Sequence, residues 1–365
     1  MAALRRQAAW QRVQGVCQYR NRAAPGGFAL IPSRLVLGWL ITLLLQLMPT
    51  LAAMLKVYSA DAVHRALPWR PLVEALSGAF AMGAEVPVRH AHALDAQDTL
   101  LLMPAWNPSV LGTKIVTVMP RHAGTRVGTV QAIYVLLDRS TGEPLALLDG
   151  EALTLRRTAA SSALAARHLA RADAASLLIV GTGRLALWLA CAHVAVRPGL
   201  RTVRVWGRRF EAAVACAEML RACPELSHAQ VHVAQDLRAA LAESDIVSCA
   251  TTASEPVVSG AWLRPGMHLD LVGGFKPSMR EVDDDAVRQA HVVVDTYAGA
   301  LQEAGELVGA LQRGVITRAH IRAELAELVR GERPGRGSAD QLTLFKSVGT
   351  ALEDLAAAQL VHAAG

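Results

Sequence analysis

The chain has 365 residues and a formal net charge of +6 at pH 7, but seven basic residues and no acidic residue lie within residues 1–56. The rest of the chain is therefore close to neutral, which excludes the basic surface expected of a nucleic-acid-binding fold. The five cysteines form neither a Cys-x-x-Cys pair nor a metal-ligand spacing, so we expect buried thiols in a reducing compartment and no metal site.

The first residues of the chain admit several interpretations. Residues 35–55 carry no charge and are long enough to cross a bilayer. Small residues near the end of this run resemble a signal peptide, and the arginine-rich start resembles a transit peptide. Met54 offers a second start for an ordinary domain, so we interpret residues 1–53 as an upstream extension or leader. The expected location is the cytoplasm, with membrane attachment only if residues 35–55 are a genuine anchor.

Residues 59–172 have the pattern of an α+β domain. Apolar residues at helical spacing predict a helix over residues 59–83, capped by Ser59 or Asp61. Short strand patterns follow at residues 86–90, 99–104, 112–118, 127–137 and 144–149. Ser140-Thr-Gly142 predicts a hairpin turn between the last two strands. An alanine-rich helix over residues 158–172 then leads to the second half of the chain.

From residue 176 onward, strands and helices alternate. Strands are predicted at residues 177–180, 202–206, 231–233, 246–249, 268–271 and 291–294. This rhythm predicts an α/β fold with a Rossmann-type, doubly wound parallel sheet. After residue 301 the pattern is helical, with a loop at 331–337 and a terminal helix at 341–360. We expect a substrate-binding and dimerisation domain over residues 54–172 and 318–365, and an NAD(P)-binding domain over residues 173–317.

The first strand of the alternating region ends in the pattern Gly181-x-Gly183-x-x-Ala186. In a dinucleotide-binding unit the first glycine permits the tight turn and the second lets the backbone approach the pyrophosphate. The phosphate charge is then held by free N–H groups where the next helix begins. The strand–loop–helix context therefore predicts a nicotinamide dinucleotide site.

The second strand of this region ends in Trp206-Gly207-Arg208-Arg209, and no acid follows until Glu211. NAD-binding folds place an acid there for the ribose diol, whereas an arginine accommodates the 2′-phosphate of NADP. We therefore expect NADP(H) to be preferred and NAD(H) to be possible.

Lysine is rare in this chain. Only four lysines occur, at positions 56, 114, 276 and 346, although arginine is abundant. Lys114 lies in an otherwise uncharged strand, Gly112-Thr-Lys-Ile-Val-Thr-Val118. An unpaired ammonium is costly to bury, so Lys114 must face a cavity or a carboxylate.

Several motifs occur together in an order that resembles the ornithine cyclodeaminase/μ-crystallin family. They are Gly112-Thr-Lys-Ile-Val116, Thr154-Leu-Arg-Arg-Thr-Ala-Ala160, Gly181-Thr-Gly183, Val272-Gly-Gly-Phe-Lys-Pro-Ser-Met-Arg-Glu-Val-Asp283 and Leu344-Phe-Lys-Ser-Val-Gly349. The resemblance covers residues 55–365. It implies an NAD(P)H-dependent enzyme and a homodimer formed through the first domain.

The resemblance also implies roles for individual residues. Arg157 and Arg89 resemble contacts to the substrate carboxylate, and Lys114 resembles the active-site lysine. Thr129 falls where family members touch the nicotinamide, and Ser347 and Val348 fall where the C-terminal segment closes the pocket. The expected cofactor-binding residues are Thr129, Gly181, Thr182, Gly183, Arg184, Leu185, Trp206, Arg208, Arg209, Thr251, Gly273 and Ser347.

One position departs from the cyclodeaminase pattern. Cyclodeaminases carry an acid just after the Gly-Gly turn, whereas this chain has Phe275, and the segment resembles instead the non-lyase branches, the ketimine reductases. We therefore expect reduction of a small cyclic imine such as Δ1-pyrroline-2-carboxylate or Δ1-piperideine-2-carboxylate to the cyclic amino acid. The proton for the nitrogen then comes from Lys114, bound water or solution. Cyclodeamination of ornithine, alanine-type dehydrogenation and noncatalytic binding of NADPH and a ligand stay open as alternatives.

Overall fold

The computed structural model describes residues 55–122, 125 and 127–365. The interpretations of residues 1–53 lie outside the described residues, as does nearly all of the apolar run 35–55. Among the helices in the described part of the chain, none is both long and apolar enough to cross a membrane.

The first half of the described chain forms a six-stranded sheet with the order β1-β6-β5-β4-β3-β2. Its strands are β1 (Lys56–Tyr58), β2 (His90–Ala93), β3 (Thr99–Trp106), β4 (Val110–Val118), β5 (Val130–Asp138) and β6 (Pro144–Asp149). Strands β2 to β6 pair antiparallel, and β1 joins β6 in parallel. The strand predicted at residues 86–90 is wrong, because Glu85 forms only an isolated bridge with Trp106 and β2 begins at His90.

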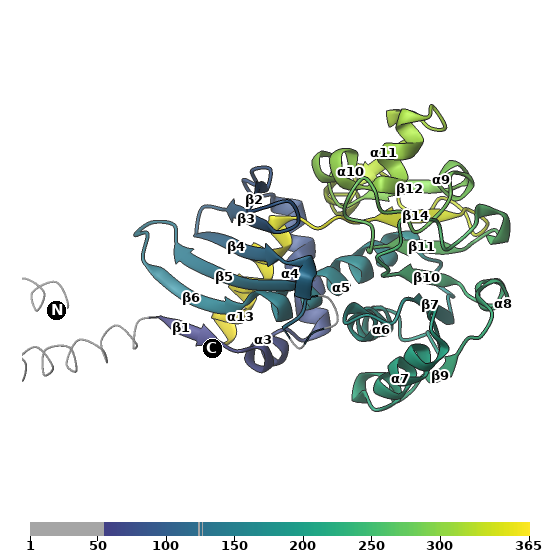
Figure 1. Ribbon diagram of the computed structural model, residues 1–365, viewed down its shortest axis with the longest axis horizontal. Coiled ribbons are helices and arrows are strands. Elements are labelled where there is room, and N and C mark those ends of the chain that lie inside the picture. Colours follow the sequence, from purple (N-terminus) through teal and green to yellow (C-terminus); the bar gives the residue numbers. More distant parts are fainter. Residues whose placement is uncertain (1–54, 123–124, 126) are drawn as a thin grey trace, which may run out of the picture. The chain divides into compact units, whose positions relative to one another are not determined.

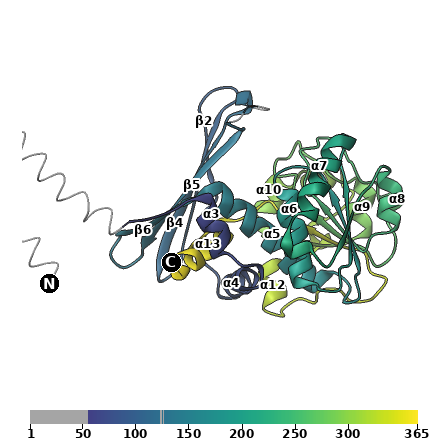
Figure 2. The same cartoon turned by 90° about the horizontal axis from the view of Figure 1, so that it is seen from below.

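Three helices pack against this sheet: α3 (Ala60–Ala66), α5 (Gly150–Leu169) and α13 (Ala351–Ala364). A fourth, α4 (Trp69–Met82), packs on α5 and α13. Figure 2 shows α3 and α13 together on one side of the sheet. The single helix predicted over residues 59–83 is wrong. It breaks at Leu67 and Pro68, because proline has no N–H and disfavours helical backbone at the residue before it. Helix α5 begins earlier than predicted, where the Asp149 side chain caps it by accepting from the Ala152 N–H.

The second sheet has eight parallel strands in the order β13-β12-β14-β11-β10-β7-β8-β9. Its strands are β7 (Ser176–Val180), β8 (Thr202–Trp206), β9 (Gln230–Val233), β10 (Ile246–Cys249), β11 (His268–Leu271), β12 (His291–Val294), β13 (Ile321–Glu324) and β14 (Thr343–Lys346). The predicted Rossmann-type fold is confirmed. The strand order reverses between β7 and β10, and ligands of such sheets bind beyond the carboxyl ends of the strands at that point.

Helices flank this second sheet on both sides (Figures 1 and 2). They are α6 (Leu185–Val196), α7 (Phe210–Arg221), α8 (Leu237–Ala242), α9 (Asp284–Gln289), α10 (Tyr297–Glu303), α11 (Gly305–Gln312) and α12 (Leu325–Val329). Helix α5 packs against α4, α6, β5 and β14 and so lies between the two sheets. Most of its side chains are buried alanine, serine and leucine, which let the neighbouring elements approach closely.

The C-terminal part of the chain differs from the prediction. The expected helix over residues 341–360 begins instead as strand β14, which is completely buried between β11 and β12. Strands β13 and β14 belong to the eight-stranded sheet, so the chain returns to the six-stranded sheet only with α13. The two strands that flank β14 come from distant parts of the chain, so the local sequence does not reveal this pairing. The other predicted domain boundaries stay a prediction.

Candidate active site

A cavity of about 380 Å³ is lined by residues of both sheets. Its apolar wall comes from β3, β4 and β5 and includes Leu101, Met103, Val116 and Val130. Ten of the residues predicted for the site line this cavity: Arg89, Lys114, Arg157, Gly183, Arg184, Leu185, Thr251, Gly273, Ser347 and Val348. The folded chain therefore brings the predicted substrate contacts and part of the predicted cofactor loop to one place.

A second cavity, of about 530 Å³, adjoins the first one. The two share Gly183, Ala250, Thr251 and Thr252 among their lining residues. The predicted residues along the second cavity are Gly181, Thr182, Gly183, Trp206, Arg208, Arg209 and Thr251. Thr129 lines neither cavity, although its neighbour Val130 lines the first. The two cavities therefore meet at the glycine loop and at the end of β10.

The glycine loop between β7 and α6 fits a bound pyrophosphate. Gly181 has a φ of 122°, and a Cβ there would lie 2.6 Å from the Ala250 carbonyl oxygen. At Gly183 an added Cβ would meet no atom within 4 Å, so the space in front of α6 is open. The first N–H groups of a helix have no intrahelical acceptor, so a helix that begins at an open space is suited to bind an anion.

The end of β8 presents two exposed arginines to the second cavity. Arg208 and Arg209 take part in no ion pair among residues 55–122, 125 and 127–365, whereas Arg204 within β8 pairs with Glu243. No acidic side chain lines the second cavity in the described chain. A phosphate would therefore meet uncompensated positive charge there.

Lys114 is buried on β4 with a carboxylate beside it. Its Nζ lies 2.8 Å from Oδ2 of Asp354 and donates to Oγ1 of Thr154 at 3.1 Å. Burial lowers the pKa of Lys114 to about 8, against the opposing effect of Asp354. The expectation that this ammonium faces a cavity or a carboxylate is met in both respects, since Lys114 also lines the first cavity.

Arg157 on α5 is held by two acids of α13. Its Nε donates to Oδ1 of Asp354 at 3.0 Å, and its Nη1 pairs with Oε2 of Glu353. Ser161 donates to the other oxygen of Glu353 at 2.7 Å. Burial raises the pKa of Glu353 to about 7, although Arg157 opposes this. Burial also favours protonation of Asp354, but the cations Lys114 and Arg157 outweigh it, and the pKa of Asp354 is lowered.

Sequence reasoning missed both acids of α13. The signal was present, because Glu353 and Asp354 are adjacent acids in a helix that is otherwise apolar except for Gln359 and His362. Both side chains are completely buried. A buried acid needs a cation as its partner, and two of the predicted site residues are those cations.

Arg89 ties the loop before β2 to the C-terminal segment. Its Nη2 donates to the carbonyl oxygens of Gly349 at 2.7 Å and Val348 at 3.3 Å, and its Nε lies 3.0 Å from Glu303. Asp295 also holds this segment through hydrogen bonds. Its Oδ2 accepts from Ser347 Oγ and from the N–H groups of Val348 and Gly349 at 2.7–3.2 Å. The segment after β14 is therefore fixed where it borders the cavity.

A buried glutamate joins the two loops on the cofactor side. Oε1 of Glu281 accepts from the N–H and the hydroxyl of Thr251 at 2.7 and 2.9 Å, and Oε2 accepts from the Gly273 N–H at 2.8 Å. At Gly273 there is no room for a side chain, because an added Cβ would lie 2.0 Å from the Thr251 carbonyl oxygen. Glu281 lies within the motif of residues 272–283, but it was not among the residues predicted for the site. It positions the Thr251 loop, which lines both cavities, and the Gly273 loop, which lines the first.

Phe275 lines the first cavity and is 41% exposed. Among the described lining residues, Glu151 is the only acid, and it pairs with Arg184. The wall that follows the Gly-Gly turn therefore offers no carboxylate to a substrate.

Comparisons with known proteins agree with this geometry. A family model described as the ornithine cyclodeaminase/mu-crystallin family matches residues 54–364. A Δ1-pyrroline-2-carboxylate reductase of Colwellia psychrerythraea is 36% identical over 314 residues, covering 84% of this chain and 98% of the relative.

The chain is also similar to solved structures of a Δ1-pyrroline-2-carboxylate reductase and an alanine dehydrogenase. The Δ1-pyrroline-2-carboxylate reductase of Thermococcus litoralis, in complex with NADH and L-proline, is 34% identical with a TM-score of 0.80, covering 85% of this chain and 97% of that one. An archaeal alanine dehydrogenase dimer with bound NAD is 26% identical with a TM-score of 0.79, covering 85% and 95%.

Proposed function

Because this chain belongs to the ornithine cyclodeaminase/mu-crystallin family, we propose that it is an NAD(P)H-dependent reductase of small cyclic imine carboxylates. Substrates of this class are Δ1-pyrroline-2-carboxylate and Δ1-piperideine-2-carboxylate, and the products are proline and pipecolate. The observation that carries the proposal is the grouping of Lys114, Arg157 and Arg89 around one cavity that opens onto the glycine loop.

The cations of the cavity are built to receive a carboxylate. Lys114 uses two of its three N–H donors on Asp354 and Thr154, and the third is left for the substrate. Arg157 uses Nε and Nη1 on the two acids of α13, which leaves its Nη2 donors. Since the acids fix both side chains before the substrate arrives, little reorganisation is needed on binding.

Reduction of the C=N bond adds a hydride at carbon and a proton at nitrogen. The reduced nicotinamide supplies the hydride when it is bound. The pKa of Lys114 is lowered to about 8, which is still above neutral pH, so Lys114 holds a proton at Nζ there. A group with a pKa near the working pH is suited to donate to the imine nitrogen, and an iminium accepts hydride more readily. Phe275 and the apolar wall contribute no base, and the single acid among the described lining residues, Glu151, is paired with Arg184.

NADP(H) is the proposed preferred cofactor. Arg208 and Arg209 supply exposed, unpaired guanidinium groups for a 2′-phosphate, and no acid lines that cavity in the described chain to hold a ribose diol. A comparison of kcat/KM for NADPH and NADH tests this preference. A tenfold preference for NADH would contradict it.

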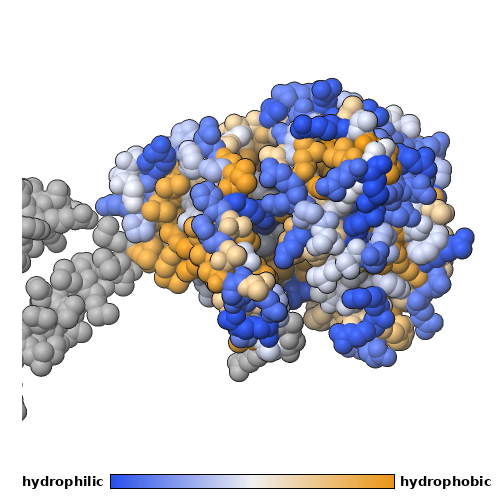
Figure 3. Space-filling model, turned by 45° about the horizontal axis from the view of Figure 1, so that its top comes forward, coloured by the Kyte–Doolittle hydropathy of each residue, from blue (hydrophilic) through white to orange (hydrophobic). Residues whose placement is uncertain are grey.

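A second copy of this chain is the proposed partner. Apolar side chains alternate with the buried ones along β3 to β6 and remain partly exposed: Leu102, Trp106, Leu111, Ile115, Ile133, Val135, Leu137, Leu145 and Leu147. Figure 3 shows hydrophobic side chains gathered over this part of the molecule. A contiguous apolar face of this kind marks an interface. Light scattering of the purified chain should give the mass of a dimer, and Ile133→Asp should shift it toward the monomer.

The activity itself is tested with a panel of cyclic imines and of α-keto acids with amines, followed by NADPH oxidation. We expect turnover with the five- and six-membered cyclic imine carboxylates. Binding of NADPH without turnover of any panel member would favour the noncatalytic alternative.

A further inference from the structure

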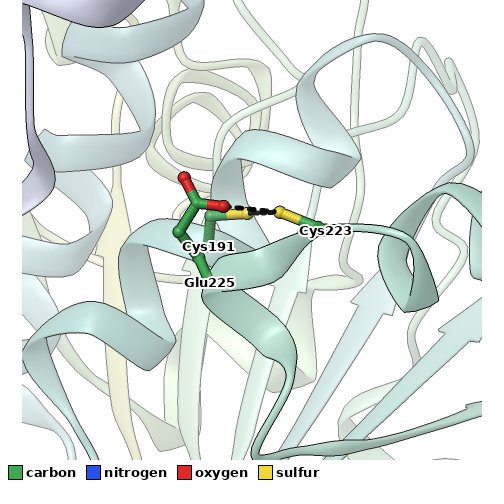
Figure 4. A group of neighbouring side chains, drawn as sticks. All are labelled: Cys191, Cys223 and Glu225. Atoms are coloured by element: carbon green, nitrogen blue, oxygen red, sulfur yellow. Dashed lines mark hydrogen bonds between the residues drawn. The ribbon is translucent and has the colours of Figure 1, made fainter.

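Three side chains that serve neither cavity meet beside helix α6. Cys191 lies within α6, Cys223 follows α7, and Glu225 lies in the short 3-10 helix after it. The two Sγ atoms are 3.2 Å apart, and Cys223 Sγ donates to Oε2 of Glu225 at 3.1 Å. One ligand atom from each residue lies within 4.8 Å of the others (Figure 4). The cluster therefore joins two segments that are separate in the sequence.

The spacing of the two sulfurs favours a shared cation over a disulfide. A tetrahedral zinc ion with Zn–S bonds of about 2.3 Å holds its sulfurs roughly 3.7 Å apart, so the thiols must separate by about half an ångström. A disulfide has an S–S bond of about 2.05 Å, so the two sulfurs would have to approach each other by more than an ångström. The carboxylate against Cys223 has no part in a disulfide, whereas it is a ligand for a cation.

A buried arginine supplies the complementary charge. The Arg156 side chain is 4% exposed, and its guanidinium lies 3.7 Å above the ring of Trp69. It forms no ion pair with a carboxylate among the described residues. Burial lowers the pKa of Arg156 to about 10, and the acidic groups that oppose this effect are Cys191, Glu225 and Cys223. Two thiolates and one carboxylate around a divalent cation carry a net charge of −1, which balances this guanidinium.

We propose that Cys191, Cys223 and Glu225 form a binding site for one thiophilic divalent cation of the Zn²⁺ class. Two thiolates and a carboxylate supply three ligands, and solvent supplies the fourth because Glu225 is exposed. The ion links α6, which begins at the glycine loop, to the segment after α7. The site is separate from the reduction chemistry, and its role is to fix these two helices together.

The test uses the full chain in the Cys17→Ala background, so that the cysteine outside the described residues does not compete. The reduced, chelator-treated protein is titrated with Zn²⁺ and with Cd²⁺, and metal content and the Cd–thiolate charge-transfer absorption are measured. We expect one equivalent per chain with the absorption band of two thiolates. Cys191→Ala and Cys223→Ala should abolish it, and the matched control Cys216→Ala, a buried thiol of α7 outside the cluster, should keep it.

Glu225→Gln removes one ligand at an exposed position, where folding is not at risk. It should lower the affinity roughly tenfold or more while the thiolate band remains. The proposal is overturned if the stoichiometric Cd–thiolate band is absent, or if Cys216→Ala loses this band as completely as the cluster variants do. It is also overturned if Glu225→Gln binds the metal with unchanged affinity, or if Cys191 and Cys223 form a disulfide under these reducing conditions.

Discussion

Asp354 and Lys114 are 240 positions apart in the chain, yet Oδ2 of Asp354 lies 2.8 Å from Nζ of Lys114. The same carboxylate accepts from Nε of Arg157 at 3.0 Å. Asp354 is completely buried and Lys114 is 2% exposed, so neither charge is stable in this position without the other. Helix α13, near the end of the chain, thus fixes the cations that α5 and β4 present to the cavity.

Lys114→Ala should lower kcat/KM for cyclic imine reduction by roughly 100-fold or more, because the variant loses both a carboxylate contact and a proton donor. The affinity for NADPH should stay nearly unchanged, since Lys114 lies on the six-stranded sheet and not at the glycine loop. Steady-state kinetics and cofactor titration measure the two effects. Lys276→Ala, which removes an exposed lysine, is the control, and near wild-type kcat/KM in Lys114→Ala would remove Lys114 from the mechanism.

Asp354→Asn should move the alkaline limb of the pH–rate profile to lower pH. In the unmodified chain, activity that needs protonated Lys114 falls as the pH rises through about 8. Removal of the Asp354 charge takes away the main effect that supports the ammonium, so the pKa of Lys114 drops further. The profile of kcat/KM against pH measures the shift. An alkaline limb at the same pH in both proteins would mean that it reports another group.

Glu353→Gln should flatten the pH dependence of stability between pH 4.5 and 7. Burial raises the pKa of Glu353 from 4.5 to about 7 in the folded chain, so the folded state binds its proton more tightly than the unfolded state. The resulting contribution is complete below pH 4.5 and is lost as the pH rises through 7, with an upper bound of about 3 kcal/mol. Denaturant unfolding at several pH values checks this, with the exposed Glu211→Gln as control. A slope as steep in Glu353→Gln as in the unmodified chain would contradict it.

Arg208→Ala should lower the affinity for NADPH by about 10- to 100-fold and leave the affinity for NADH unchanged. The reason is that one charge-assisted phosphate contact contributes roughly 1.5–3 kcal/mol. Dissociation constants for both cofactors measure the difference. Arg204→Ala is the matched control, since Arg204 pairs with Glu243 and lines neither cavity. Equal losses for both cofactors would assign Arg208 a structural role.

Phe275 should exclude ornithine cyclodeamination. That reaction oxidises an amine, closes a ring with loss of ammonia and returns the hydride, and its proton transfers need an acid or base beside the α-carbon. The phenyl ring in the cavity wall offers neither. Ornithine with NAD⁺ or NADP⁺ should release no ammonia, and Phe275→Asp should gain weak release while imine reduction declines. Clear ammonia release by the unmodified chain would restore the lyase assignment.

The sequence determined the parts of this protein that depend on neighbouring residues. The family, the Rossmann-type fold and the alternation of strands and helices are confirmed. The loop around Gly181 and Gly183 could be predicted because a tight turn and an open helix N-terminus depend only on a few neighbouring residues. The break at Pro68 could also have been predicted from the local sequence, since proline restricts the backbone of the residue before it. The prediction of a single helix did not take this into account.

Only the tertiary structure decided which charges meet. Asp354, Glu353 and Glu281 appear in the sequence as ordinary acids. The roles of Asp354 and Glu353 follow from burial beside cations far away in the chain, and that of Glu281 from burial beside backbone N–H groups of two loops. Strand β14 likewise became a strand because β11 and β12 flank it. The strength of an ion pair depends on distance and burial, and both are set only when segments hundreds of residues apart pack together.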